Sequence, residues 1–138
     1  MKSTLGAPLP KRARKGDAGY DFFMPRDMEV WWNTGTSVID TGIAMEEGDI
    51  PEGYFMMLVP RSSLGSRGMA LMNTVGIIDS GYRDTIKARL IAHAQLEAPI
   101  KLEKGERFMQ GILVPFGVIP SEEPPTEERS GGFGSTGA

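Results

Sequence analysis

The chain has 138 residues, of which 40% are hydrophobic and 24% charged, a balance typical of one soluble domain with its own core. Its net charge of −3 argues against binding nucleic acid through bulk charge, and neither its apolar runs nor its first ten residues resemble a membrane helix or a signal peptide. Because the chain has no cysteine and a single histidine, disulfides, thiolate nucleophiles and metal sites built from Cys or several His are excluded.

Five segments have the pattern of β-strands, because they are rich in β-branched or aromatic residues and are bounded by Gly, Pro, Asp or Asn. These segments are 20–24, 36–45, 53–59, 85–92 and 107–119. Turns are predicted at 46–53 and 103–106, and at most a turn or two of helix at 62–68. Many short strands with regular turns predict an all-β sandwich or barrel with little helix.

The composition changes at Pro120, after which proline and acidic residues precede a glycine-rich end. We therefore expect a β domain over 1–119 and a mobile arm over 120–138. The basic run at 11–15 is interpreted as a solvated edge before the first strand, with a nucleic-acid contact or a localisation signal as the alternative.

Three internal segments contain candidate functional residues. Arg61, Ser62 and Ser63 directly follow a predicted strand, where they could bind a phosphate, although serines there could also cap a helical turn. Asp21 could serve a metal, and Gln110 could donate to a phosphate, but each is individually compatible with a structural role.

The segment 77–82, IIDSGY, is predicted to form a β-hairpin with Asp79 at its tight end. An aspartate beside a turn usually hydrogen-bonds its own backbone. The functional alternative is a general base that takes a proton from water, an effect of roughly 10²–10⁴-fold on rate.

The ending RSGGFGSTGA has the glycine spacing of a P-loop, but lysine is missing and no strand or helix flanks it, so a P-loop is rejected. Two interpretations stay open: a disordered tail, or an arm that covers a phosphate and a base. The second would use the guanidinium of Arg129, the ring of Phe133 and the hydroxyls of Ser135 and Thr136.

Taken together, five stretches resemble, in order, the five motifs of the trimeric dUTPase family. They are AGYD (18–21), VPRSSLGSRG (59–68), NTVGIIDSGYRDTIKARL (73–90), GERFMQG (105–111) and RSGGFGSTGA (129–138). The resemblance implies a jelly-roll-like β subunit that assembles as a homotrimer with active sites shared between subunits. It also implies a dUTP diphosphatase that uses Mg²⁺ to cleave dUTP to dUMP and pyrophosphate, and so limits uracil in DNA. Such an enzyme would be cytoplasmic (in the host cytoplasm for a viral protein) and would bind neither nucleic acid nor membrane.

By the same resemblance, Asp79 would activate the water that attacks the α-phosphorus, and Asp21 would orient metal-bound waters from the second shell. Other matching positions would bind the substrate: Arg61, Ser62, Ser63 and Gln110 the phosphates, Asn73 and the backbone of Gly76, Ile77 and Ile78 the uracil, Tyr82 the sugar, with Lys87 on the same strand. The arm would close the site, with Phe133 on the uracil and Arg129, Ser135 and Thr136 on the terminal phosphates.

Two departures from the family pattern stand out. RSGGFG is one residue shorter than the usual arm motif, which affects the reach of Arg129, and Asp84-Thr85 replace the usual Gly-Glu at a strand start. One alternative is a dCTP deaminase of the same fold, but Arg89 occupies the position of its catalytic glutamate. A regulatory protein switched by nucleotide is the alternative from another class.

Overall fold

The computed structural model describes residues 1–31, 37–93 and 98–129. In this part of the chain, ten strands and one short helix follow in order. Their bounds are β1 (Lys2–Ser3), β2 (Tyr20–Phe23), β3 (Met28–Val30), β4 (Ser37–Ala44), β5 (Tyr54–Pro60), α1 (Ser62–Ser66), β6 (Met69–Leu71), β7 (Gly76–Ile78), β8 (Thr85–Ala92), β9 (Ile100–Leu102) and β10 (Arg107–Pro115). The predicted all-β class with little helix is confirmed, and the arrangement is jelly-roll-like.

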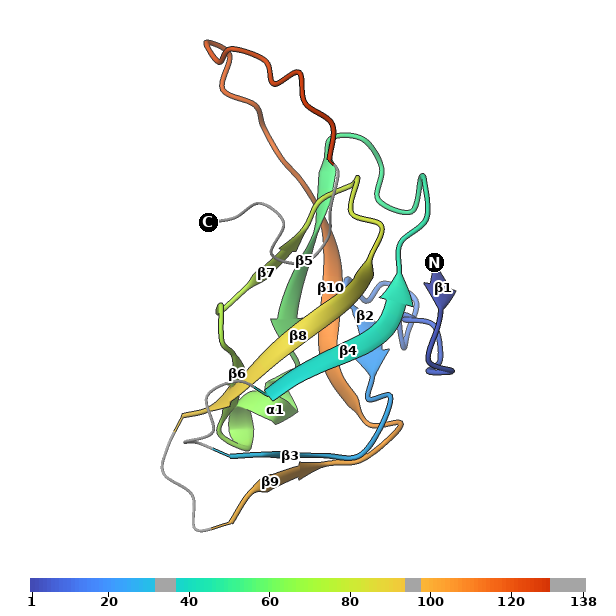
Figure 1. Cartoon of the computed structure of the whole chain (residues 1–138), viewed down its shortest axis with the longest axis vertical. Coiled ribbons are helices and arrows are strands. Elements are labelled where there is room, and N and C mark those ends of the chain that lie inside the picture. Colours follow the sequence, from blue (N-terminus) through green and yellow to red (C-terminus); the bar gives the residue numbers. More distant parts are fainter. Residues whose placement is uncertain (32–36, 94–97, 130–138) are drawn as a thin grey trace.

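The strands form two four-stranded sheets, in the orders β1-β4-β8-β6 and β2-β10-β5-β7, and a separate pair β3-β9. All of the pairings are antiparallel. Figure 1 shows β4 and β8 crossing in front of β5 and β10, with β3 and β9 at one end of the molecule, below α1. Two sheets that face each other in this way bury one side of each strand between them.

The core lies between the two large sheets and is built mainly from aliphatic residues, methionines and two phenylalanines. On β8 the buried side chains alternate, at Ile86, Ala88 and Leu90, as a half-buried strand requires. Burying a side chain of this size contributes about 1.5–3 kcal/mol, so this alternation fixes which face of β8 points inward.

A register shift interrupts the pairing of β4 with β8 between Asp40 and Ala44. The buried Thr41 satisfies its hydroxyl there, since Oγ1 donates to the carbonyl of Ile86 at 2.6 Å and accepts from the backbone of Ile43 at 3.1 Å. A buried hydroxyl without such partners would cost free energy, so the DTGIA segment is held in its bend by these bonds.

The five predicted long strands are confirmed, with bounds that differ by a few residues. The last strand ends at Pro115 rather than at 119, because residues 116–120 leave the sheet and are exposed. The strands β1, β3, β6 and β9 were not predicted, since two or three residues are too few for a period-two pattern. No helix in the described ranges is long and apolar enough to cross a membrane.

The predicted hairpin over 77–82 is wrong. β7 pairs with β5 in one sheet, whereas β8, the next strand along the chain, pairs with β4 and β6 in the other. Tyr82 donates its backbone N–H to the carbonyl of Asp79 at 3.1 Å, so the turn exists, but it leads the chain from one sheet to the other. The local sequence signals a turn without specifying which strand pairs with which.

Candidate active site

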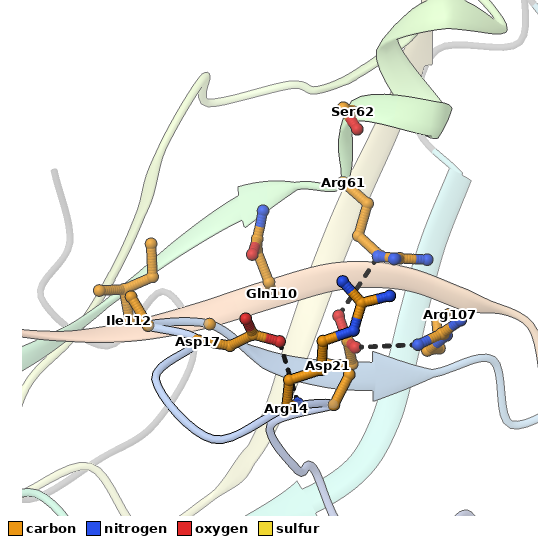
Figure 2. Close-up of a pocket in the computed structure, with 11 residues that line it drawn as sticks. Arg14, Asp17, Asp21, Arg61, Ser62, Arg107, Gln110 and Ile112 are labelled. Atoms are coloured by element: carbon orange, nitrogen blue, oxygen red, sulfur yellow. Dashed lines mark hydrogen bonds and ion pairs between the residues drawn. The ribbon is translucent and has the colours of Figure 1, made fainter.

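A polar pocket of about 450 Å³ opens where β2 and β10 pass the start of α1. Figure 2 shows its side chains converging from the loop before β2, from β10 and from the end of β5. The lining residues are Ala13, Arg14, Asp17, Ala18, Gly19, Asp21, Arg61, Ser62, Arg107, Gln110 and Ile112. Three of the eleven are arginines, so the pocket is suited to an anion.

Asp21 lines this pocket and is only 7% exposed. Its Oδ1 lies 3.2 Å from Nε of Arg61, and its Oδ2 lies 3.5 Å from Nη1 of Arg107. A carboxylate this far from water needs such partners, because burying an unpaired charge is costly. The two ion pairs therefore fix both guanidiniums at the pocket wall (Figure 2).

The β-sheet register brings Gln110 beside Asp21. Gln110 pairs with Asp21 on one side and with Val59 on the other, so residues about 90 positions apart share a row of the sheet. Gly19 is needed for this arrangement, since a Cβ at that position would lie 2.2 Å from Oε1 of Gln110. The glycine of AGYD therefore leaves the space in which the amide of Gln110 lies.

Arg61 is the residue before the first turn of α1, and its backbone N–H donates to the carbonyl of Phe108 at 3.1 Å. The predicted helical turn is confirmed, but the alternative role of the serines as helix caps is not found, because the helix starts at Ser62, its N-cap is Arg61 and it has no side-chain cap. Ser62 and Ser63 are both exposed, and only Ser62 lines the pocket.

A second group of predicted site residues lies around β7. Gly76 is buried against Leu58, whose Cβ would lie 3.1 Å from a Cβ added at the glycine. Along the strand, Ile78 is buried and Ile77 is 64% exposed. β7 is the last strand of its sheet, so its free edge is an open set of backbone donors and acceptors.

The turn before β7 is ordered by its own side chains. Asn73 donates from Nδ2 to the carbonyl of Val75 at 3.1 Å, and Thr74 has a positive φ of 67°. A non-glycine residue in this conformation is uncommon and signals a specific local requirement. Asn73 itself is exposed beside the edge of β7.

Asp79 follows β7, and its side chain is 63% exposed. Its Oδ2 lies 3.4 Å from Nη2 of Arg129, whose Cζ lies 5.3 Å from the centre of the Tyr82 ring. Tyr82 is buried, and its hydroxyl donates to the carbonyl of Thr85 at 3.1 Å. Lys87, further along β8, donates from Nζ to Oγ1 of Thr85 at 3.3 Å.

The single chain does not bring the two groups together. Asp21, Arg61, Ser62 and Gln110 share the pocket, whereas Asn73, Asp79, Tyr82 and Arg129 are absent from its lining. Arg129 contacts the turn at Asp79, and its predicted binding of phosphate stays a prediction. Phe133, Ser135 and Thr136 lie outside the described residues.

Sequence reasoning missed two arginines of the pocket. Arg107 stands three residues before Gln110 in GERFMQG, and Arg14 belongs to the basic run that was interpreted as a solvated edge. The missed signal for Arg107 was its place in the same motif as Gln110. Nothing local distinguished Arg14 from its basic neighbours.

The described residues contain no group of three or more carboxylate, His or Cys side chains that could hold a metal ion. Both oxygens of Asp21 are already engaged by arginines. Magnesium usually keeps several waters and is bound through one or two carboxylates and substrate phosphates. The donor set therefore fits a hydrated ion carried by a phosphate ligand, rather than an ion bound directly by several carboxylates.

Comparisons with known proteins agree in pointing to one family. The family model described as dUTPase matches residues 6–137. The deoxyuridine 5'-triphosphate nucleotidohydrolase of Escherichia phage T5 is 42% identical over 151 residues, which covers 100% of this chain and 97% of the phage protein.

Solved structures give the same result. The dUTPase of Staphylococcus bacteriophage 80alpha with dUPNHPP matches with a TM-score of 0.70 at 27% identity, covering 96% of this chain and 93% of that chain. A mutant dUTPase of phage phi11 of S. aureus, described with the coordination of a structural Mg(II) ion, matches with a TM-score of 0.69 at 25% identity, covering 88% and 91%.

Proposed function

Because this chain belongs to the dUTPase family, we propose that it hydrolyses dUTP to dUMP and pyrophosphate, with water attacking the α-phosphorus. The activity of a dUTP diphosphatase follows from the family, and the polar pocket around Asp21 is the observation that carries its phosphate chemistry. The products, the metal and the role of each residue are the finer content of the proposal.

In this proposal the pocket binds the phosphates. Arg61, Ser62 and Gln110 present a guanidinium, a hydroxyl and an amide to one space, which are donors suited to phosphate oxygens. The ion pair with Asp21 holds the Arg61 side chain in place before the substrate arrives, so less rotamer freedom is lost on binding. Ser63 is the least supported of the four, since it does not line the pocket.

Asp79 is the proposed general base. Its carboxylate is exposed on the turn after β7, where it can hydrogen-bond a water and accept its proton as the water attacks. The ion pair with Arg129 also brings a guanidinium to this position, where it can stabilise charge that develops on the α-phosphate.

The edge of β7 is the proposed base-binding element. Free backbone groups at Gly76, Ile77 and Ile78, with the nearby amide of Asn73, can read the uracil by hydrogen bonds, and a wrong exocyclic group would leave buried partners unpaired. The buried ring of Tyr82 would pack against the deoxyribose and exclude a 2′-hydroxyl. Lys87 is assigned to the same side, with its amine held by Thr85.

Magnesium bound to the triphosphate would neutralise phosphate charge and polarise the phosphoryl oxygens. Asp21 would accept hydrogen bonds from its waters, because the carboxylate faces the pocket and keeps the lone pairs that its two arginines leave free. The remaining arm residues, Phe133, Ser135 and Thr136, are proposed to cover the base and the terminal phosphates.

The chain is also proposed to act as a homotrimer with shared sites. The support is that the pocket around Asp21 and the turn around Asp79 do not share a cavity within one chain. Exposed apolar side chains near β7, at Met72, Val75 and Ile77, would be covered if this face lay against another subunit.

A nucleotide panel with product identification tests the reaction. Full-length protein with Mg²⁺ should release dUMP and pyrophosphate from dUTP and turn over dCTP, dTTP and UTP far more slowly. Comparable hydrolysis of all four would refute the assignment. Ammonia release from dCTP would instead indicate a deaminase, which the exposed Arg89 on β8 argues against.

A further inference from the structure

Three guanidiniums line the pocket, and two of them are ion-paired with the same carboxylate. Arg61 and Arg107 both pair with Asp21. Arg14 extends from its loop into the same pocket (Figure 2), and within residues 1–31, 37–93 and 98–129 no carboxylate pairs with its guanidinium. The pocket therefore contains one arginine whose charge and five N–H donors are available to a ligand.

The backbone around Arg14 is a closed loop rather than a loose end. Lys11 and Asp21 bridge its base, with the N–H of Asp21 donating to the carbonyl of Lys11 at 2.8 Å. At its tip, Asp17 accepts from the backbone N–H of Arg14 at 3.0 Å through Oδ2 and donates its own N–H to the Arg14 carbonyl at 3.2 Å. Gly16 makes this turn possible with a φ of 94°.

The other basic residues of the loop are placed differently. Arg12 lies over the ring of Tyr20, with Cζ 5.9 Å from its centre, and donates to the carbonyl of Asp17 at 3.4 Å. Lys11 lies over Phe23 at 6.0 Å, and Lys15 is exposed and does not line the pocket. Within the run KRARK, Arg14 is thus the basic residue that lines the pocket.

We propose that Arg14 binds the pyrophosphate portion of the substrate, as a phosphate-binding residue contributed by the loop before β2. The guanidiniums of the pocket outnumber its carboxylates by three to two, and a free guanidinium can hold two phosphate oxygens at once. This inference rests on the proposed function for the phosphates concerned. Three guanidiniums suit the β- and γ-phosphates, the most highly charged part of the substrate, so the pocket is assigned to them rather than to the α-phosphorus at which Asp79 acts.

The test compares two variants that remove the same charge from the same loop, Arg14→Gln and Lys15→Gln. Calorimetric titration of the full-length protein with inorganic pyrophosphate, and separately with dUMP, measures both parts of the substrate site. For Arg14→Gln we expect pyrophosphate affinity to fall by about 10- to 100-fold, the usual range for a lost hydrogen bond to a charged group. For Lys15→Gln the fall should be less than about 2-fold, because an exposed charge outside the pocket is screened by salt.

Affinity for dUMP should change by less than about 2-fold in both variants, because Arg14 contacts only the phosphates that dUMP lacks. Arg14→Lys keeps the charge without the bidentate donors, so its pyrophosphate affinity should lie between those of the wild type and Arg14→Gln. If circular dichroism shows that Arg14→Gln is unfolded, Arg14→Lys is compared with Lys15→Gln instead. Equal pyrophosphate affinity in Arg14→Gln and Lys15→Gln, or equal losses for pyrophosphate and dUMP, would overturn the proposal.

The two proposals fail in distinguishable ways. If the wild type does not hydrolyse dUTP, but Arg14→Gln binds pyrophosphate more weakly than Lys15→Gln does, the reaction is contradicted and the phosphate site is supported. A wild-type protein that hydrolyses dUTP, with pyrophosphate affinity unchanged in Arg14→Gln, would support the reaction and refute the role of Arg14.

Discussion

The pocket around Asp21 and the turn around Asp79 carry the same residue type in opposite settings. Asp21 is 7% exposed and bound by two arginines from different parts of the fold, whereas the side chain of Asp79 is 63% exposed and touches one arginine of the arm. A carboxylate held between fixed cations can orient its surroundings, and an exposed one can reach a water and change protonation state. The two aspartates are therefore suited to different tasks.

The backbone around the two aspartates differs in the same way. Asp21 lies on β2, where Gln110 of β10 pairs with it on one side and Lys11 bridges it on the other, while Asp79 follows β7, an edge strand three residues long. The backbone at Asp21 is thus paired on both sides within one chain, whereas β7 presents a free edge that a ligand or another chain can complete.

The largest expected effect is on the exposed aspartate. Asp79→Asn should lower kcat by about 10²–10⁴-fold, because the amide cannot accept the proton of the attacking water. Steady-state kinetics measures the loss, and dUTP binding should persist because the base and phosphate contacts remain. Stability should change by no more than about 0.5 kcal/mol, as for other exposed positions. A variant with near-normal kcat would remove Asp79 from the role of base.

The buried aspartate should behave differently. Asp21→Asn should destabilise the fold by about 1–3 kcal/mol, because two guanidiniums at the pocket wall lose their counter-charge. The two guanidiniums are partly exposed, which keeps the cost below that of a fully buried ion pair. Urea unfolding measures this, with Asp17→Asn, on the exposed loop, as the matched control. Equal stability of the two variants would mean that the ion pairs of Asp21 contribute little.

A smaller effect is expected at Gly19. Gly19→Ala places a Cβ 2.2 Å from the present position of Oε1 of Gln110, so the amide must move away from the phosphate site while the backbone stays. The KM for dUTP should rise by about 10-fold, the lower end of the range for one hydrogen bond to a charged phosphate.

A double-mutant cycle distinguishes this mechanism from a general disturbance of the pocket at Gly19. In a Gln110→Ala background the alanine at position 19 should add almost nothing, because the group it displaces is already gone. Additive effects of the two changes would show that Gly19 acts through something other than Gln110.

The smallest effect lies outside both regions. The amino group of Met1 hydrogen-bonds Asp49, which lowers the pKa of that carboxyl below its ordinary value of 3.8. Because the pKa is lowered in the folded state, the ionised carboxylate stabilises the fold at any pH above 3.8. This stability is lost as the pH falls below 3.8 toward the folded pKa. Asp49→Asn should therefore cost less than about 1 kcal/mol at pH 7, and the difference from wild type should vanish in strong acid. A difference that persists there in thermal unfolding would argue for another cause.

The sequence predicted the long strands because their alternation and flanking turn residues are local signals, as at 85–92. It did not predict that 76–78 pairs with 56–58 rather than with its own downstream neighbour. Strand pairing depends on how the two sheets close around the core, and the apolar pattern of IIDSGY is compatible with either partner.

The site shows the same limit. Asp21 and Gln110 were each predicted as isolated candidates, and the register of β2 with β10 makes them neighbours. Arg14 was missed because a basic run looks alike at every position, while the direction of each side chain depends on the bridge between Lys11 and Asp21 and the turn at Gly16.

Mixing two inactive variants tests most directly whether the two regions act together across chains. Arg61→Gln impairs the pocket and leaves the turn intact, and Asp79→Asn does the reverse. If a site combines the pocket of one chain with Asp79 of another, equal mixtures that have exchanged subunits should recover about a quarter of wild-type dUTP hydrolysis, since random assembly repairs that share of sites. A mixture no more active than its separate components would show that pocket and base must belong to the same chain, and would contradict the shared site.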